Sequence, residues 1–346
     1  MLKQVGMAAA LLCMATTATA QTTITVGGVA AAPGRIVSGT LEIAARQGDS
    51  GTSVPFTIIN GMSRGPVLAL IAGTHGMEYV PIVALQRLRG AIDPNTLRGA
   101  VLMVHVANMP SFLGRTIYYS PVDGKNLNRV YPGKADGTIS ERIAEVITRE
   151  VIAASTHVVD LHCGDGNESL RPYSYWITTG DAKVAEAGRA MALAFGLDHI
   201  VVDRERPADP AASVYTSNTA ITRGKPALTT ETGGMGIVDE ESLQLVENGV
   251  AGLMRHLGMR EEGPKPIVAP ILLQRNEVLR AGFTGLFYAA VEKGHTVAKG
   301  TVLGRVTDFH GRMLEEIVSP FDGEVLYVVG TPAMSKGEPV AMVGAR

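Results

Sequence analysis

Two short segments of the chain carry residue types that bind divalent metals. His75 and Glu78 lie in the motif GTHGME, directly after the apolar run 66–72. If a helix begins here, residues three apart share a face, so an imidazole and a carboxylate can grip one cation. His162 follows a second predicted strand, 158–161. Two histidines and one glutamate with an open fourth position form a catalytic zinc set, so we expect one Zn²⁺ per chain.

A zinc-activated water needs a proton acceptor that is not itself a ligand. Zinc polarises a carbonyl and lowers the pKa of its bound water towards neutrality. Glu231 is the candidate acceptor, because its motif TTETGG follows a third apolar run, 227–229. The neighbouring glycines allow close approach of the backbone. The alternative that the sequence leaves open is an exposed loop carboxylate.

A polar, turn-rich segment, 123–133 (DGKNLNRVYPG), holds Arg129. An arginine presents a planar fork that binds a carboxylate through two hydrogen bonds. Arg115 is a second cation nearby in sequence. The alternative is a surface loop with an incidental arginine.

Other polar residues near these motifs have simpler interpretations. We expect Asp160 on the opposite strand face from His162, with at most a role in orienting it. Cys163 has no evident activating partner in the sequence and is interpreted as a small packing residue. Asp165 and Glu168 follow His162 and can touch substrate, or belong to a polar loop.

The elements that must position these residues alternate between strands and helices. The continuous apolar run 66–72 predicts a strand buried on both faces. Further strands are expected at 101–104, 158–161, 199–202 and 227–229. Apolar periodicity and capping residues predict helices, at 78–88, from Ser140 through Val151, from Asp181 through Phe195 and from Asp239 through Leu257. This alternation predicts an α/β domain with a mixed sheet flanked by helices.

A linker composition marks the domain boundary. Residues 259–270 (MREEGPKPIVAP) hold three prolines and several charges. From residue 271 onward, short β-rich runs are divided by glycine turns. We therefore expect an α/β hydrolytic domain at 21–262 and a small all-β domain at 271–346.

The overall composition excludes several classes of protein. Hydrophobic residues make up 46% of the 346 residues and charged residues 18%, which is too apolar for a disordered chain. The formal net charge of −2 lacks the basic surplus of a nucleic-acid-binding protein.

Residues 1–20 have the order of an export signal. Lys3 precedes the apolar run 6–15 (GMAAALLCMA), and Ala18-Thr19-Ala20 is an A-x-A cleavage pattern. We expect cleavage after Ala20, a periplasmic location, and no membrane insertion of the mature protein. The single cysteine then left cannot form an intramolecular disulfide.

Taken together, the motifs resemble those of the succinylglutamate desuccinylase/aspartoacylase family, which is related to zinc carboxypeptidases. The matching motifs run in family order: GTHGME at 73–78, NLNRVYPG at 126–133, DLH at 160–162 and TETGG at 230–234. The resemblance covers roughly residues 50–346. It implies a zinc-carboxypeptidase-like mixed sheet, with zinc on His75, Glu78 and His162.

The resemblance also implies roles for the remaining site residues. Glu231 would be the general base and then the general acid. Asn128 and Arg129 would bind a substrate carboxylate. By a looser alignment, Arg115 would polarise the scissile carbonyl.

The C-terminal part resembles the β-domain of these deacylases, which is similar to biotinyl/lipoyl domains. The likeness lies in 292–300 (EKGHTVAKG) and 319–325 (SPFDGEV). Residues 307–313 (TDFHGRM) stand where a carrier has its cofactor-bearing Met-Lys-Met hairpin. We therefore expect a wall or lid of the active site and not a carrier.

We predict a zinc-dependent amidohydrolase that cleaves a small, carboxylate-bearing N-acyl amino acid. The first alternative is a periplasmic zinc carboxypeptidase acting on small or cell-wall peptides. The second is a non-catalytic periplasmic binding protein. The expected partner is a small N-acylated substrate, and an oligomer is possible.

Overall fold

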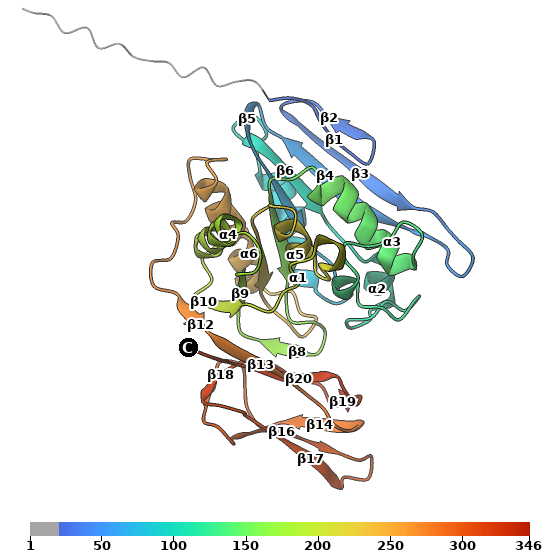
Figure 1. Ribbon diagram of the computed structural model, residues 1–346, viewed down its shortest axis with the longest axis vertical. Coiled ribbons are helices and arrows are strands. Elements are labelled where there is room, and N and C mark those ends of the chain that lie inside the picture. The colour runs from blue at the N-terminus through green and yellow to red at the C-terminus, as the bar shows by residue number, and fades with distance from the viewer. Residues whose placement is uncertain (1–20) are drawn as a thin grey trace, which may run out of the picture.

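In this computed structural model, residues 21–346 are described, and the predicted export signal lies outside them. A nine-stranded mixed sheet forms the centre of the larger part of the molecule (Figure 1). Its strands run in the order β12 (Ile271–Leu273), β10 (His199–Asp203), β9 (Tyr173–Ile177), β11 (Ala227–Glu231), β7 (His157–His162), β5 (Ser63–Ile71), β6 (Arg98–Val104), β4 (Thr52–Asn60) and β3 (Arg35–Ile43). β11, β7, β5 and β6 are mutually parallel.

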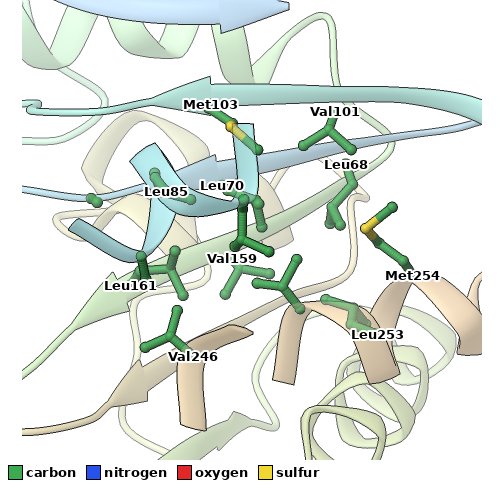
Figure 2. Packing of buried hydrophobic residues seen from close by; sticks show 14 of the residues in the cluster. Leu68, Leu70, Leu85, Val101, Met103, Val159, Leu161, Val246, Leu253 and Met254 are labelled. Atoms are coloured by element: carbon green, nitrogen blue, oxygen red, sulfur yellow. The ribbon is translucent and has the colours of Figure 1, made fainter. Parts of the chain in front are cut away.

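Helices cover both faces of this sheet, because the central strands are apolar on both sides. On one face, Leu68 and Leu70 of β5 pack against α1 (Tyr79–Ala91), α4 (Ala182–Phe195) and α6 (Glu240–His256). Figure 2 shows this cluster, with Leu85 of α1 and Val246 of α6 facing the strands.

The alternate residues of the same strand face the other side. There Ala69 and Ile71 pack with α3 (Ile139–Val146), its π-helical continuation Ile147–Ile152, and α5 (Thr216–Ile221).

The C-terminal part consists of two antiparallel sheets and lies below the α/β part in Figure 1. One sheet holds β13 (Arg275–Arg280), β20 (Pro339–Ala345), β18 (Gly323–Val329) and β15 (Thr296–Val297). The other holds β17 (Met313–Val318), β16 (Val302–Thr307), β14 (Gly285–Ala289) and β19 (Ala333–Met334). The predicted fold class, a mixed α/β sheet plus a small all-β part, is confirmed.

Two strands cross the expected boundary between these parts. β8 (Glu168–Leu170), which belongs to the α/β segment, pairs with β18 of the C-terminal sheet. β12 follows the predicted linker, yet it pairs with β10 of the main sheet. The chain therefore returns to the α/β sheet for three residues before it enters the β part.

Some elements differ from the expectation. Thr138, and not Ser140, occupies the cap position of α3, where it forms a capping box with Glu141. The N-terminal strands β3 and β4 were not expected, nor was the β1–β2 hairpin (Ile24–Val26 and Val29–Ala31). Within residues 21–346, no helix is long and apolar enough to cross a membrane.

Candidate metal centre and active site

The candidate ligands and the candidate base converge because their strands are parallel neighbours. His75 follows β5, His162 is the last residue of β7, and Glu231 is the last residue of β11. In the sheet register Glu231 lies opposite His162. The carboxyl ends of adjacent parallel strands meet at one edge, where ligands of α/β sheets gather.

The loop between β5 and α1 brings the first two ligands together. Gly73 adopts a positive φ of 70°, and a Cβ there would lie 2.9 Å from Val106 Cα. Glu78 then occupies the N-cap position of α1, so it enters the site from the helix start.

One buried cluster contains the three predicted ligands. Donor atoms of His75, Glu78 and His162 all lie within 4.8 Å of one another. His75 Nδ1 is 2.7 Å from Glu78 Oε1, and His162 Nδ1 is 2.9 Å from Glu78 Oε2. Both histidines therefore direct the same ring nitrogen toward the carboxylate.

The other ring nitrogens contact polar groups outside the cluster. His75 Nε2 is 3.1 Å from Asn126 Oδ1, and His162 Nε2 is 3.0 Å from Asp160 Oδ1. The Asn126 acceptor places the ring proton of His75 on Nε2 and leaves its Nδ1 lone pair for a metal. The expectation for Asp160 was wrong, because residues two apart in a strand point to the same face.

The donor set fits a metal ion. The Glu78 side chain is buried, and its two carboxylate oxygens face the two imidazoles. Burial alone would raise the pKa of Glu78, but the adjacent His162 and His75 outweigh it and hold the pKa well below its usual range. An ionised carboxylate with two imidazoles and one open position is typical of catalytic zinc sites.

A cavity of about 240 Å³ adjoins the cluster. We call it the metal cavity. Its walls combine metal-ligating, acidic, aromatic and cationic side chains, among them His75, Glu78, Tyr118, Asn126, Arg129, Cys163, Glu168, Glu231, Arg280 and Tyr327. Arg280 belongs to β13 and Tyr327 to β18, so the C-terminal part supplies a wall of this cavity.

Glu231 lines the metal cavity but is not a member of the ligand cluster. Burial raises the pKa of Glu231 well above its ordinary value, although His162 opposes the shift. A carboxyl group with a raised pKa next to a metal cluster is suited to accept and hold a proton.

In the segment 126–129, Asn126 and Arg129 line the metal cavity, whereas Asn128 is buried in the core. Arg129 lines the cavity, donates from Nη1 to the Asn128 carbonyl at 2.7 Å, and lies 4.6 Å from the Tyr215 ring centroid. Asn128 is buried behind His162, with its Nδ2 3.1 Å from His162 Nε2. Its Oδ1 accepts from the Thr216 backbone at 2.9 Å. Asn128 therefore does not line the cavity, and it contacts the candidate ligand His162 from behind.

Arg115 does not join the site. It is exposed at the left-handed C-cap of α2 (Met109–Gly114), with φ 53°, and it is not among the residues that line the metal cavity. This exposed position differs from the expected role of Arg115 at the scissile carbonyl.

Sequence reasoning missed a hydroxyl in the cavity. The Tyr118 hydroxyl donates to Glu168 Oε1 at 2.6 Å, and its ring meets His75 edge-on at 5.8 Å. Burial raises the pKa of Glu168 to about 7, and burial reinforced by Glu78 raises that of Asp165 to about 6. No local sequence pattern marks Tyr118, whose backbone N–H donates to Asp165 of a distant segment at 3.2 Å.

Cys163 lies in the cavity wall and also packs in the core between sheet and helices. Burial raises the pKa of its thiol well above the ordinary value. The neutral thiol is a packing group and not a nucleophile.

Comparisons with known proteins point to one family. Residues 64–257 match the model of the Succinylglutamate desuccinylase/Aspartoacylase catalytic domain. Over 261 residues the chain is 33% identical to the N-alpha-acetyl-L-2,4-diaminobutyric acid deacetylase of Halomonas elongata, and the match covers 74% of each protein.

Solved structures resemble most of the chain. The product-bound structure of the ectoine utilization protein EutE (DoeB) from Ruegeria pomeroyi is 26% identical, with a TM-score of 0.79, covering 90% of this chain and 95% of that one. A succinylglutamate desuccinylase/aspartoacylase from Rhodobacter sphaeroides is also 26% identical, with a TM-score of 0.76 and the same coverage.

Proposed function

The chain belongs to the succinylglutamate desuccinylase/aspartoacylase family, and from that premise we propose that it is a zinc-dependent amidohydrolase that deacylates a small N-acyl amino acid. The observation that carries the proposal is the buried cluster of His75, Glu78 and His162 with Glu231 in the same cavity. One cavity therefore contains both a set of metal donors and a separate proton acceptor.

His75, Glu78 and His162 would hold one zinc ion per chain. When bound, zinc supplies a Lewis acid that polarises a carbonyl and lowers the pKa of water. The outer contacts from Asn126 and Asp160 keep the two imidazoles oriented for that role.

Glu231 moves the proton in this proposal. Water adds to the amide carbonyl carbon, and the Glu231 carboxylate accepts the proton that the water loses. When the carbon–nitrogen bond breaks, Glu231 returns this proton to the leaving amine. The raised pKa of Glu231 supports this role, because the group must hold the proton between the two steps.

We propose that Arg129 binds a carboxylate of the substrate. Its guanidinium lines the metal cavity, and no carboxylate among the described residues forms an ion pair with it. The substrate in the name of the Halomonas elongata relative has a carboxylate next to its acetamide. That chemistry supports N-acetyl amino acids as the first substrates to test. Asn128 supports the site by positioning His162.

Carboxylate binding by Arg129 can be tested with one pair of substrates. We expect the wild-type protein to hydrolyse an N-acetyl amino acid about 10-fold faster, as kcat/KM, than its α-carboxamide, since a lost hydrogen bond to a charged group costs about 1.5 kcal/mol or more. Arg129→Ala should lose the preference, and Arg129→Lys should recover only part of it, because lysine lacks the planar fork. An unchanged acid-to-amide ratio in Arg129→Ala would reject this role.

The enzyme class needs a separate test. The zinc-loaded protein should release amino acids from an N-acetyl or N-succinyl substrate panel, and chelation should stop the release. Faster removal of C-terminal residues from N-blocked peptides would instead indicate the carboxypeptidase alternative. Zinc binding without hydrolysis of either panel would indicate a binding protein.

A further inference from the structure

A second cavity, of about 480 Å³, lies beside the metal cavity. We call it the arginine cavity, after the five arginines in its walls: Arg129, Arg204, Arg206, Arg275 and Arg280. Its walls share five residues with those of the metal cavity: Arg129, Tyr175, Val278, Arg280 and Met342. The two spaces therefore adjoin, with Arg129 and Arg280 at the junction.

The charges in the arginine cavity do not balance. Two acidic residues, Asp203 and Glu205, line it alongside the five arginines, which leaves a formal surplus of three positive charges. Arg206 pairs with Asp203, with Nε and Oδ2 2.5 Å apart. Within the described part of the chain, no carboxylate forms an ion pair with any of the other four arginines.

Neutral contacts hold two of these arginines in place. β10 and β12 are parallel neighbours, so the segments that follow them lie side by side. Arg204 donates to the Gln274 carbonyl at 3.2 Å and to the Gln274 Oε1 at 2.5 Å. Arg275 lies 4.0 Å from the Phe321 ring centroid. These contacts position the guanidinium groups without neutralising their charge.

The junction is built in the same way. Arg129 and Arg206 both lie over the Tyr215 ring, at 4.6 and 3.7 Å from its centroid. Arg280 donates from Nη1 to the Gly337 carbonyl at 2.9 Å. Like charges that line one cavity repel one another, and a bound anion relieves the repulsion.

We infer that the arginine cavity is a subsite for carboxylates at the far end of the substrate. The inference rests on the proposed function: the acyl amide lies at the metal cluster and Arg129 binds the adjacent carboxylate. The rest of the amino acid then passes the junction into the arginine cavity. The expected substrate is an N-acyl amino acid with two features. It has a free α-carboxylate for Arg129, and it has a long side chain that ends in carboxylates. Guanidinium forks match such carboxylates in charge and shape.

Two matched substrates test the subsite. N-acetyl-γ-glutamyl-glutamate keeps a carboxylate next to the acetamide and carries two more at its far end. N-acetyl-γ-glutamyl-glutaminamide has the same length without the distal charges. We expect the wild type to prefer the charged substrate in kcat/KM. The preference should shrink between about 0.02 and 0.5 M salt, because exposed charges are screened.

Variants test whether the preference for the charged substrate arises in the arginine cavity. Arg204→Gln combined with Arg275→Gln should reduce the preference about 4- to 25-fold, at roughly 2- to 5-fold for each exposed arginine. Arg305→Gln is the matched control, since Arg305 also stacks on an aromatic ring, Tyr288 at 5.4 Å, but lies outside both cavities. It should leave the preference unchanged.

Equilibrium binding separates this inference from the proposed function. The deacetylated dipeptides, γ-glutamyl-glutamate and γ-glutamyl-glutaminamide, can be titrated by calorimetry without any turnover. Tighter binding of the charged dipeptide that weakens in the double variant supports the subsite even if neither substrate is hydrolysed. Equal affinity for the two dipeptides in the wild type, or a preference that the double variant retains, would overturn it.

Discussion

At the residue scale, the buried carboxylate of Asp160 lies against the outer ring nitrogen of His162. Asp160 Oδ1 lies 3.0 Å from His162 Nε2, and its other oxygen is 3.4 Å from Asn128 Nδ2. We expect Asp160→Asn to weaken zinc affinity about 10- to 100-fold, as is typical when an outer partner of a metal-bound histidine is lost. Competition with a chromophoric chelator measures the dissociation constant.

Asp239→Asn is the control for this measurement. Asp239 caps α6 through the Ser242 backbone, and asparagine caps helices equally well. Its zinc affinity should equal that of the wild type. If Asp160→Asn also binds zinc with wild-type affinity, Asp160 does not orient the ligand.

Glu231 gives a second residue-scale prediction. Glu231→Gln should keep the metal, because Glu231 is outside the ligand cluster. Turnover should fall about 10²- to 10⁴-fold, the usual contribution of a general acid–base group, since an amide cannot accept the proton. Zinc content and kcat are measured on the same preparation, with exposed Glu240→Gln as the matched variant. Near-normal kcat would remove Glu231 from the mechanism.

The sequence predicted those site residues that follow buried strands. His75, His162 and Glu231 each come at or just after the end of an apolar run, and parallel pairing brings such ends together. The sequence did not predict where Arg115 and Asn128 lie, because neither residue follows a buried strand. Arg280 could not be found locally, since it reaches the cavity from the C-terminal part.

At the element scale, Asp123 fastens the loop that carries Arg129 to the start of α3. Its carboxylate accepts from the Ser140 backbone N–H at 3.0 Å and from the Ser140 hydroxyl at 2.9 Å. The first N–H groups of a helix have no partner within the helix. We expect Asp123→Ala to lower the free energy of unfolding by about 1 kcal/mol and to raise KM, because the Arg129 loop loosens.

The same contact predicts a pH dependence. Burial alone would raise the pKa of Asp123, but hydrogen bonds led by the Ser140 backbone outweigh it and lower the pKa. A lowered folded-state pKa stabilises the protein above the unfolded pKa of about 3.9, and this stabilisation is lost as pH falls through the folded value. The stability gap between wild type and Asp123→Ala in urea unfolding should therefore be wide at neutral pH and narrow in acid. A constant gap would contradict the ionised contact.

Helices and strands with a local sequence signal, such as a capping residue or an apolar run, were predicted, and those without one were missed. Helices α4 and α6 begin after Asp181 and Asp239, as their capping residues indicated. β3 was missed because it is an edge strand whose residues are mostly half-buried or exposed, so it lacks a continuous apolar run. β12 was missed as a sheet strand because its partner, β10, is distant in sequence.

At the scale of the whole molecule, the two parts are joined by a strand and an ion-pair cluster. β8 extends the C-terminal sheet through β18, and Glu168 at its start lines the metal cavity. Beside this pairing, Glu324 of β18 contacts Arg171 Nε at 2.5 Å and His199 Nε2 at 3.1 Å. We expect the wall that the C-terminal part contributes to the metal cavity to depend on this attachment.

Glu324→Ala tests the attachment. The substitution leaves the His199 side chain, which is 1% exposed, without its Nε2 partner. An unpaired buried polar group costs about 1–3 kcal/mol, so we expect urea unfolding to show a loss of that size. KM should rise because Tyr327, also on β18, lines the metal cavity. Zinc content should not change, because all three candidate ligands belong to the α/β part.

The matched control is Glu292→Ala, which removes a glutamate of the same C-terminal part whose side chain is 84% exposed and 3.8 Å from His295. Exposed pairs of this kind contribute about 0–1 kcal/mol, so its stability and KM should stay close to those of the wild type. Wild-type stability in Glu324→Ala would show that β8 pairing and apolar packing alone hold the two parts together. Loss of stability with unchanged KM would show that the wall does not depend on this contact.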